Sequence, residues 1–103
     1  MTVKERSFLT RAMAKSGKSM DYSDIPSFKI DKHSTGDLGD KTSLILSPLV
    51  ACLGLKNPMV AGRGLGHTGG TIDKLETIPG FNTGMSFENM KEAIKKVGCF
   101  ICG

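Results

Sequence analysis

The chain has 103 residues, with 14 Lys and Arg against 10 Asp and Glu, which gives a formal net charge of +4. Such a length fits one small domain with a modest core and is short for a complete enzyme with a deep cleft. Hydrophobic residues make up 39% and charged residues 23%, values that argue against disorder. Ser47 and Pro48 interrupt the longest apolar stretch, which falls well short of the roughly 20 residues of a membrane span. We therefore expect no membrane partner.

The charge distribution and the cysteines bear on partners and location. Lys and Arg are scattered and Trp is absent, so we expect no nucleic-acid partner. Residues 1–17 lack the apolar block of a secretory signal, and three cysteines form no even-numbered disulfide framework, which favours the cytoplasm. Cys99 and Cys102 have CxxC spacing, but their apolar run is more typical of a buried strand than of a redox or metal site.

In chain order, the first expected element is an amphipathic helix. Apolar side chains recur at helical spacing over residues 3–15, and Ser16 and Gly17 provide a stop. A polar connector over residues 18–27 then leads into a short extended stretch at residues 28–30.

The middle of the chain predicts a helix and a strand, each next to a glycine-bearing loop. The first loop, residues 32–39, ends at Asp40, which can cap a helix over about residues 41–53. This helix is rich in Leu, Ile and Val and almost free of charge, which predicts burial on most sides. Residues 58–61 predict a buried strand, and the second glycine loop, residues 62–70, follows it.

The last third predicts two helices and a strand. A short helix covers residues 71–76, and Ser86 caps a second helix over residues 87–97 whose apolar side chains share one face. Residues 99–102 predict the final strand. The alternation of helices and strands indicates an α/β fold, as part of a mostly parallel sheet flanked by helices. Because parallel sheets are normally covered on both faces, we expect the chain to be a piece of a larger sheet.

Both glycine loops run from a strand into the start of a helix, a geometry that directs backbone N–H groups and the positive end of the helix dipole at an anion. Phosphate is the simplest such ligand. Lys32 can add a positive charge, and hydroxyl groups can add hydrogen bonds. The hydroxyl-bearing candidates are Ser34, Ser43 and Thr71. The loops do not have the GxxxxGK[ST] spacing of a nucleotide-triphosphate loop. The alternative is that the glycines only allow tight turns.

Each loop contains one histidine, and neither suggests a metal site. His33 has two readings: a proton donor near neutral pH, or a side chain that holds the loop in shape. His67 has the same two readings, and loop structure is favoured for it. Two histidines far apart and a terminal cysteine pair do not make a ligand set, so these residues suggest no metal site, and no cofactor is expected.

The residues from Lys32 to Ser43 (KHSTGDLGDKTS) and from Ala61 to Glu76 (AGRGLGHTGGTIDKLE) resemble the thymidine phosphorylase and pyrimidine-nucleoside phosphorylase family. This resemblance implies reversible phosphorolysis of a pyrimidine nucleoside to the free base and a pentose 1-phosphate, in pyrimidine salvage. It also implies a homodimer in which residues 1–17 end a helical domain, residues 18–27 connect, and residues 28–103 form an incomplete phosphate-binding domain.

The resemblance also assigns roles to single positions. The phosphate-binding positions of the family match Lys32, Ser34, Ser43 and Thr71. His33 matches the histidine near the carbonyl of the base, where it hydrogen-bonds or protonates the leaving group. Backbone oxygens at Gly39 and Lys41 match positions that help to hold a structural potassium ion in some members.

Three departures from the family pattern leave alternatives open. Asp37 and Leu38 replace a glycine and a small aliphatic residue, and Ala61 replaces a phosphate-binding serine. The chain also stops before the residues that grip the pyrimidine in family members. The alternatives are a non-catalytic truncated remnant, a small phosphate-binding module unrelated to phosphorolysis, and a transferase that uses a phosphoribosyl donor.

Overall fold

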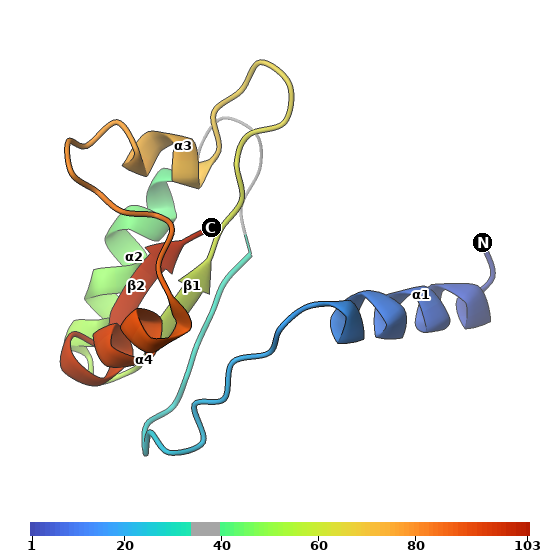
Figure 1. The fold of residues 1–103 in the computed structure, drawn as a ribbon, viewed down its shortest axis with the longest axis horizontal. Helices are drawn as coiled ribbons and strands as arrows, with labels where there is room; N and C mark the ends of the chain where they lie inside the picture. Colours follow the sequence, from blue (N-terminus) through green and yellow to red (C-terminus); the bar gives the residue numbers. More distant parts are fainter. Residues whose placement is uncertain (34–39) are drawn as a thin grey trace.

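The computed structural model describes residues 1–33 and 40–103. The elements occur in the order α1 (Val3–Ser16), α2 (Lys41–Cys52), β1 (Asn57–Val60), α3 (Thr71–Leu75), α4 (Phe87–Lys96) and β2 (Cys99–Cys102), as Figure 1 shows. This arrangement confirms the predicted α/β class and every expected helix. None of the described helices is long and apolar enough to cross a membrane.

The sheet is parallel, as expected. β1 pairs with β2 in the register Asn57 to Cys99 through Val60 to Cys102. On the other side of β1, the predicted extended stretch forms a single parallel bridge between Lys29 and Lys56. The residues that follow both of these segments therefore leave the sheet at its carboxyl-terminal edge, where ligands bind in open α/β folds.

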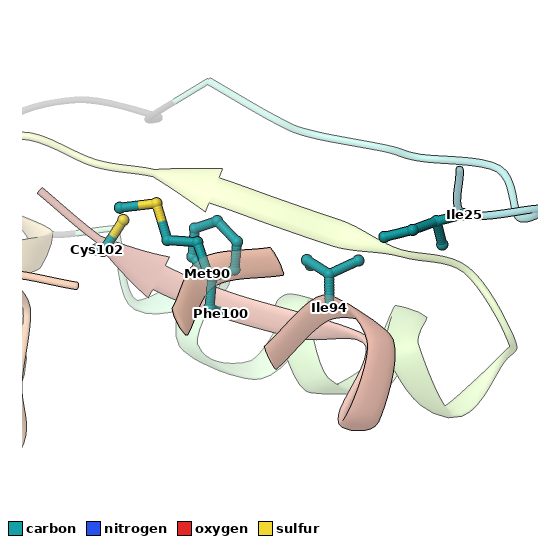
Figure 2. Close-up of a cluster of buried hydrophobic side chains, with 5 residues drawn as sticks. All are labelled: Ile25, Met90, Ile94, Phe100 and Cys102. Carbon is teal, nitrogen blue, oxygen red and sulfur yellow. The ribbon is translucent and has the colours of Figure 1, made fainter. Parts of the chain in front are cut away.

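The core lies between α4 and one face of the sheet. Figure 2 shows the five buried side chains that gather there. They are Ile25, Met90, Ile94, Phe100 and Cys102. Ile25 comes from the segment predicted as a polar connector, and its side chain is only 4% exposed. The connector is thus packed onto α4, and Asp24 adds ion pairs to Lys91 and Lys95, each at 2.9 Å.

The second face of the sheet packs against α2. Because successive strand residues point to opposite faces, Cys99 and Ile101 face away from the α4 core. They line an apolar groove of about 440 Å³ together with Leu44 and Pro48 of α2. The prediction that the helix is buried on most sides was wrong. Its buried residues are Ser43, Ser47 and Val50, while Ile45 is 71% exposed, because no other described element packs against that side of α2.

Hydrogen bonds at the helix starts explain where the helices begin. The Ser86 hydroxyl accepts the N–H of Asn89 at 3.2 Å, as predicted for the start of α4. Thr2 and Glu5 form a reciprocal capping box at the start of α1. α1 is a regular helix, but none of its residues is buried and it extends away from the sheet (Figure 1).

Candidate functional site

The first candidate site lies where residues 31–33 leave the sheet and α2 begins. Asp40 caps α2, and its carboxylate is almost completely buried at 2% exposure. Lys32 Nζ lies 2.5 Å from Asp40 Oδ1, and the Ser43 N–H donates to the same oxygen at 3.3 Å. The Ser43 hydroxyl donates to Asp40 Oδ2. Two of the predicted phosphate-binding side chains, Lys32 and Ser43, therefore meet around one carboxylate.

The electrostatics of this cluster favour an ionised Asp40. Burial raises the pKa of its carboxyl, but the hydrogen bonds from Lys32 and Ser43 together lower that pKa by more, so the net shift is downward. The Lys32 side chain is 21% exposed, so it is not closed off from solvent. An ammonium has three donors, and the bond to Asp40 uses one of them.

A small cavity of about 30 Å³ adjoins the cluster. Its polar lining residues are Asp31, Lys32, Ser43, Ser47 and Asn57. The Ser47 hydroxyl is buried and has no hydrogen-bond partner within the part of the chain that the structure describes. This volume suits about one water molecule and is too small for phosphate, so an anion must approach Lys32 from its exposed side.

The second glycine loop is closed by hydrogen bonds to its own helix. Asp73 Oδ2 accepts the N–H groups of Gly64 at 2.6 Å and Gly70 at 2.7 Å. These two amide groups point at a carboxylate of the chain itself, contrary to the expectation that the loop directs its N–H groups at an external anion. The signal was present in the sequence, since an acidic residue three positions after the helix-capping residue is a capping pattern.

Arg63 links this loop to α3 and to the residue that follows it. Its guanidinium makes a bidentate pair with Glu76 at 2.6 and 2.7 Å and a third contact with Asp73 at 3.1 Å. Thr83 donates a further hydrogen bond to Glu76 at 2.7 Å. The Arg63 guanidinium and the Thr83 hydroxyl lower the pKa of the Glu76 carboxyl to about 2. Sequence reasoning missed this network, because its members are separated by up to 20 positions.

The remaining predicted site residues are placed as follows. Thr71 is the first residue of α3 and is buried, whereas Lys41 is the exposed first residue of α2. Ala61 directly follows β1 and lines a separate pocket of about 270 Å³ with Thr83 and Gly103. His33 is exposed beside Lys32.

Ser34 and Gly39, together with the departures Asp37 and Leu38, lie outside the described residues. Across residues 1–33 and 40–103, no three His, Cys, Asp or Glu side chains gather closely enough to hold a metal ion. The potassium site implied at Gly39 and Lys41 therefore stays a prediction.

Residues 27–103 match the family described as "Glycosyl transferase family, a/b domain". The chain belongs to this glycosyl transferase family. The match begins just before the segment that pairs with Lys56 and includes both glycine loops, α2, α3, α4 and the sheet. The family domain is thus the part of the chain in which the strands, the helices packed on them and the candidate site lie together.

Relatives of this glycosyl transferase domain carry more specific names. Thymidine phosphorylase of Homo sapiens is 51% identical over 104 residues, which cover all of this chain and 22% of that protein. Thymidine phosphorylase of Rhizobium meliloti is 53% identical over 95 residues, and pyrimidine-nucleoside phosphorylase of Staphylococcus epidermidis is 56% identical over 86 residues. The aligned residues make up 92% of this chain in the first of these two matches and 84% in the second. In each match they span about one fifth of the relative.

Proposed function

We propose that the protein carrying this domain catalyses the reversible phosphorolysis of a pyrimidine nucleoside, and that this segment supplies the phosphate side of its active site. The observation that carries the proposal is the meeting of Lys32 and Ser43 at the start of α2, around the buried Asp40 carboxylate. The names of relatives that are 51% to 56% identical supply the reaction class.

In the proposed reaction, a phosphate oxygen attacks the anomeric carbon of the pentose. A C–O bond forms as the C–N bond to the base breaks, and the electron pair of that bond leaves with the base. Catalysis then needs phosphate held in line and the charge on the departing base neutralised. Lys32 and the N-terminus of α2 supply positive charge for the first task, and His33 donates a hydrogen bond or a proton to the base for the second.

The test is phosphate-dependent release of free base by the full-length protein. Thymidine and uridine are each incubated with and without inorganic phosphate, and the base is measured by liquid chromatography. Lys32→Met should raise the KM for phosphate about 10- to 100-fold, the range for loss of a hydrogen bond to a charged group. His33→Ala should lower kcat by about 10²- to 10⁴-fold, the usual contribution of a general acid.

Lys96→Met is the matched control, because Lys96 is exposed on α4 and pairs with Glu92. Lys96→Met should leave the KM for phosphate and kcat unchanged. Base released at the same rate without phosphate, or no release from any pyrimidine nucleoside, contradicts the proposal. Phosphate binding without nucleoside turnover would favour a phosphate-binding module in its place.

A further inference from the structure

We propose that Asp40 is the positioning residue of the phosphate site, because its buried carboxylate holds the Lys32 ammonium against the start of α2. The inference rests on the proposed function for the identity of the ligand and adds a residue to that site. Its basis is the geometry already described: Oδ1 binds Lys32 Nζ at 2.5 Å and the Ser43 N–H at 3.3 Å, while Oδ2 binds the Ser43 hydroxyl.

The physical need for such a residue comes from the charges that converge here. The start of a helix carries partial positive charge, equivalent to about half an elementary charge, and Lys32 adds a full one. Two positive groups repel each other when no anion is bound, and an unpaired lysine would turn its ammonium into water. The Asp40 carboxylate lies between them and is 2% exposed, so solvent screens its attraction for Lys32 only weakly.

The count of donors shows how the same cluster can then hold phosphate. The Lys32 ammonium has three N–H donors, and its bond to Asp40 uses one of them. The single O–H donor of Ser43 is directed at Asp40, and rotation of the hydroxyl would redirect this hydrogen bond to a phosphate oxygen. Asp40 Oδ1 would still accept from Lys32 and from the Ser43 N–H. The carboxylate therefore stays hydrogen-bonded while phosphate binds.

A purely structural role for Asp40 as the cap of α2 is the competing explanation. Asparagine caps a helix about as well as aspartate, but it has no charge with which to hold Lys32. Asp40→Asn therefore separates the two roles. Asp40→Ser is a second capping variant that is too short to reach Lys32, and it keeps the test available if the asparagine protein does not fold.

The experiment measures binding of inorganic phosphate to the full-length protein by calorimetry, together with the KM values for phosphate and nucleoside. Asp40→Asn should weaken phosphate binding about 10- to 100-fold and leave the KM for nucleoside near its wild-type value. In a Lys32→Met background, Asp40→Asn should add little further loss, because the carboxylate acts through Lys32.

Asp24→Asn is the matched control, because Asp24 is an exposed carboxylate paired with Lys91 and Lys95 away from the site. It should change neither KM. Unchanged or tighter phosphate binding in Asp40→Asn would overturn the inference, as would an equal loss with and without Lys32.

The inference and the proposed function fail in different ways. A wild-type protein that binds phosphate but releases no base overturns the proposed function, while a loss of that binding in Asp40→Asn still supports the role of Asp40. Release of base by Asp40→Asn with an unchanged KM for phosphate overturns only the role of Asp40. A wild-type protein that binds no phosphate overturns both.

Discussion

At the scale of single residues, Ala61 is a position where one missing oxygen is expected to limit phosphate binding. Its backbone N–H donates to the Cys102 carbonyl at 2.7 Å at the end of β1, and its side chain lines an open pocket. The family resemblance drawn from the sequence implies a phosphate-binding serine at this position.

We predict that Ala61→Ser tightens phosphate binding by about 10- to 100-fold, the effect of one added hydrogen bond to a charged group. Calorimetric titration of the full-length protein with phosphate measures the change. Ala12→Ser on the exposed α1 is the control and should have no effect. An unchanged dissociation constant in Ala61→Ser would place the phosphate away from the end of β1.

Gly64 and Gly70 are required by the close approach of two backbone segments within the second loop. A Cβ at Gly64 would lie 1.7 Å from the Thr68 carbonyl oxygen, and one at Gly70 would lie 2.5 Å from the backbone carbon of Arg63. In contrast, a Cβ at Gly62 would meet no atom within 4 Å. The explanation that these glycines permit a tight loop is thus supported at Gly64 and Gly70.

Gly64→Ala and Gly70→Ala should each lower the free energy of unfolding by about 1–3 kcal/mol, because the loop must open to admit a methyl group. Gly62→Ala should stay within about 0.5 kcal/mol of wild type, as is usual for an unhindered surface change. Urea unfolding followed by far-ultraviolet circular dichroism compares the three variants. Equal stability of all three would show that the loop does not need its close backbone contact.

At the scale of elements, local sequence signals predicted the positions of those helices and strands that local interactions determine. Ser86 and the apolar spacing after it located α4, and the short apolar run at residues 99–102 located β2. The prediction that α2 is buried on most sides was wrong because burial of a helix depends on the elements packed against it. The composition of the helix alone does not show whether those elements are present. The contact between Lys32 and Asp40 was also missed. The sequence identifies Asp40 as a helix cap, which is a local feature, whereas Lys32 lies eight positions earlier.

The Arg63 network makes the attachment of α3 sensitive to pH. The pKa of Glu76 is about 2 in the folded chain against an ordinary value of 4.5, so the unfolded chain binds its proton first as pH falls. The stabilisation from the Arg63 to Glu76 pair is therefore present above about pH 5 and is lost between pH 5 and 2. Asp73, whose pKa is lowered mainly by the N–H groups of Gly64 and Gly70, adds to the same trend.

Glu76→Gln should flatten the fall of unfolding free energy between pH 5 and pH 2, because the ion pair is already absent. Urea unfolding of both proteins at a series of pH values measures the slope. Glu88→Gln on the exposed side of α4 is the matched control and should keep the wild-type slope. The same acid dependence in Glu76→Gln as in wild type would contradict the role of this pair.

At the scale of the whole molecule, the main cluster of buried hydrophobic side chains lies on one side of a two-stranded sheet. The α4 face has a closed core, whereas the α2 face keeps an apolar groove of about 440 Å³. Sheets of two strands are marginal without helices packed on them, so the stability of this chain depends on its packed helices, among them α4 with the connector that carries Ile25. α1 contributes none of the buried side chains.

Removal of residues 1–17 should therefore leave the stability of the remaining fold unchanged to within about 0.5 kcal/mol, the range for changes that remove no buried contact. α1 has 14 residues and is exposed throughout, and helices of about 12–15 residues are marginal in water without packing. Its amides should exchange with solvent rapidly, while those of α4, which buries Met90 and Ile94, should be protected. Urea unfolding of residues 18–103 and hydrogen exchange of the whole chain test the two statements separately. A drop of several kcal/mol on deletion, or protection of α1 equal to that of α4, would show that α1 packs against another surface in solution.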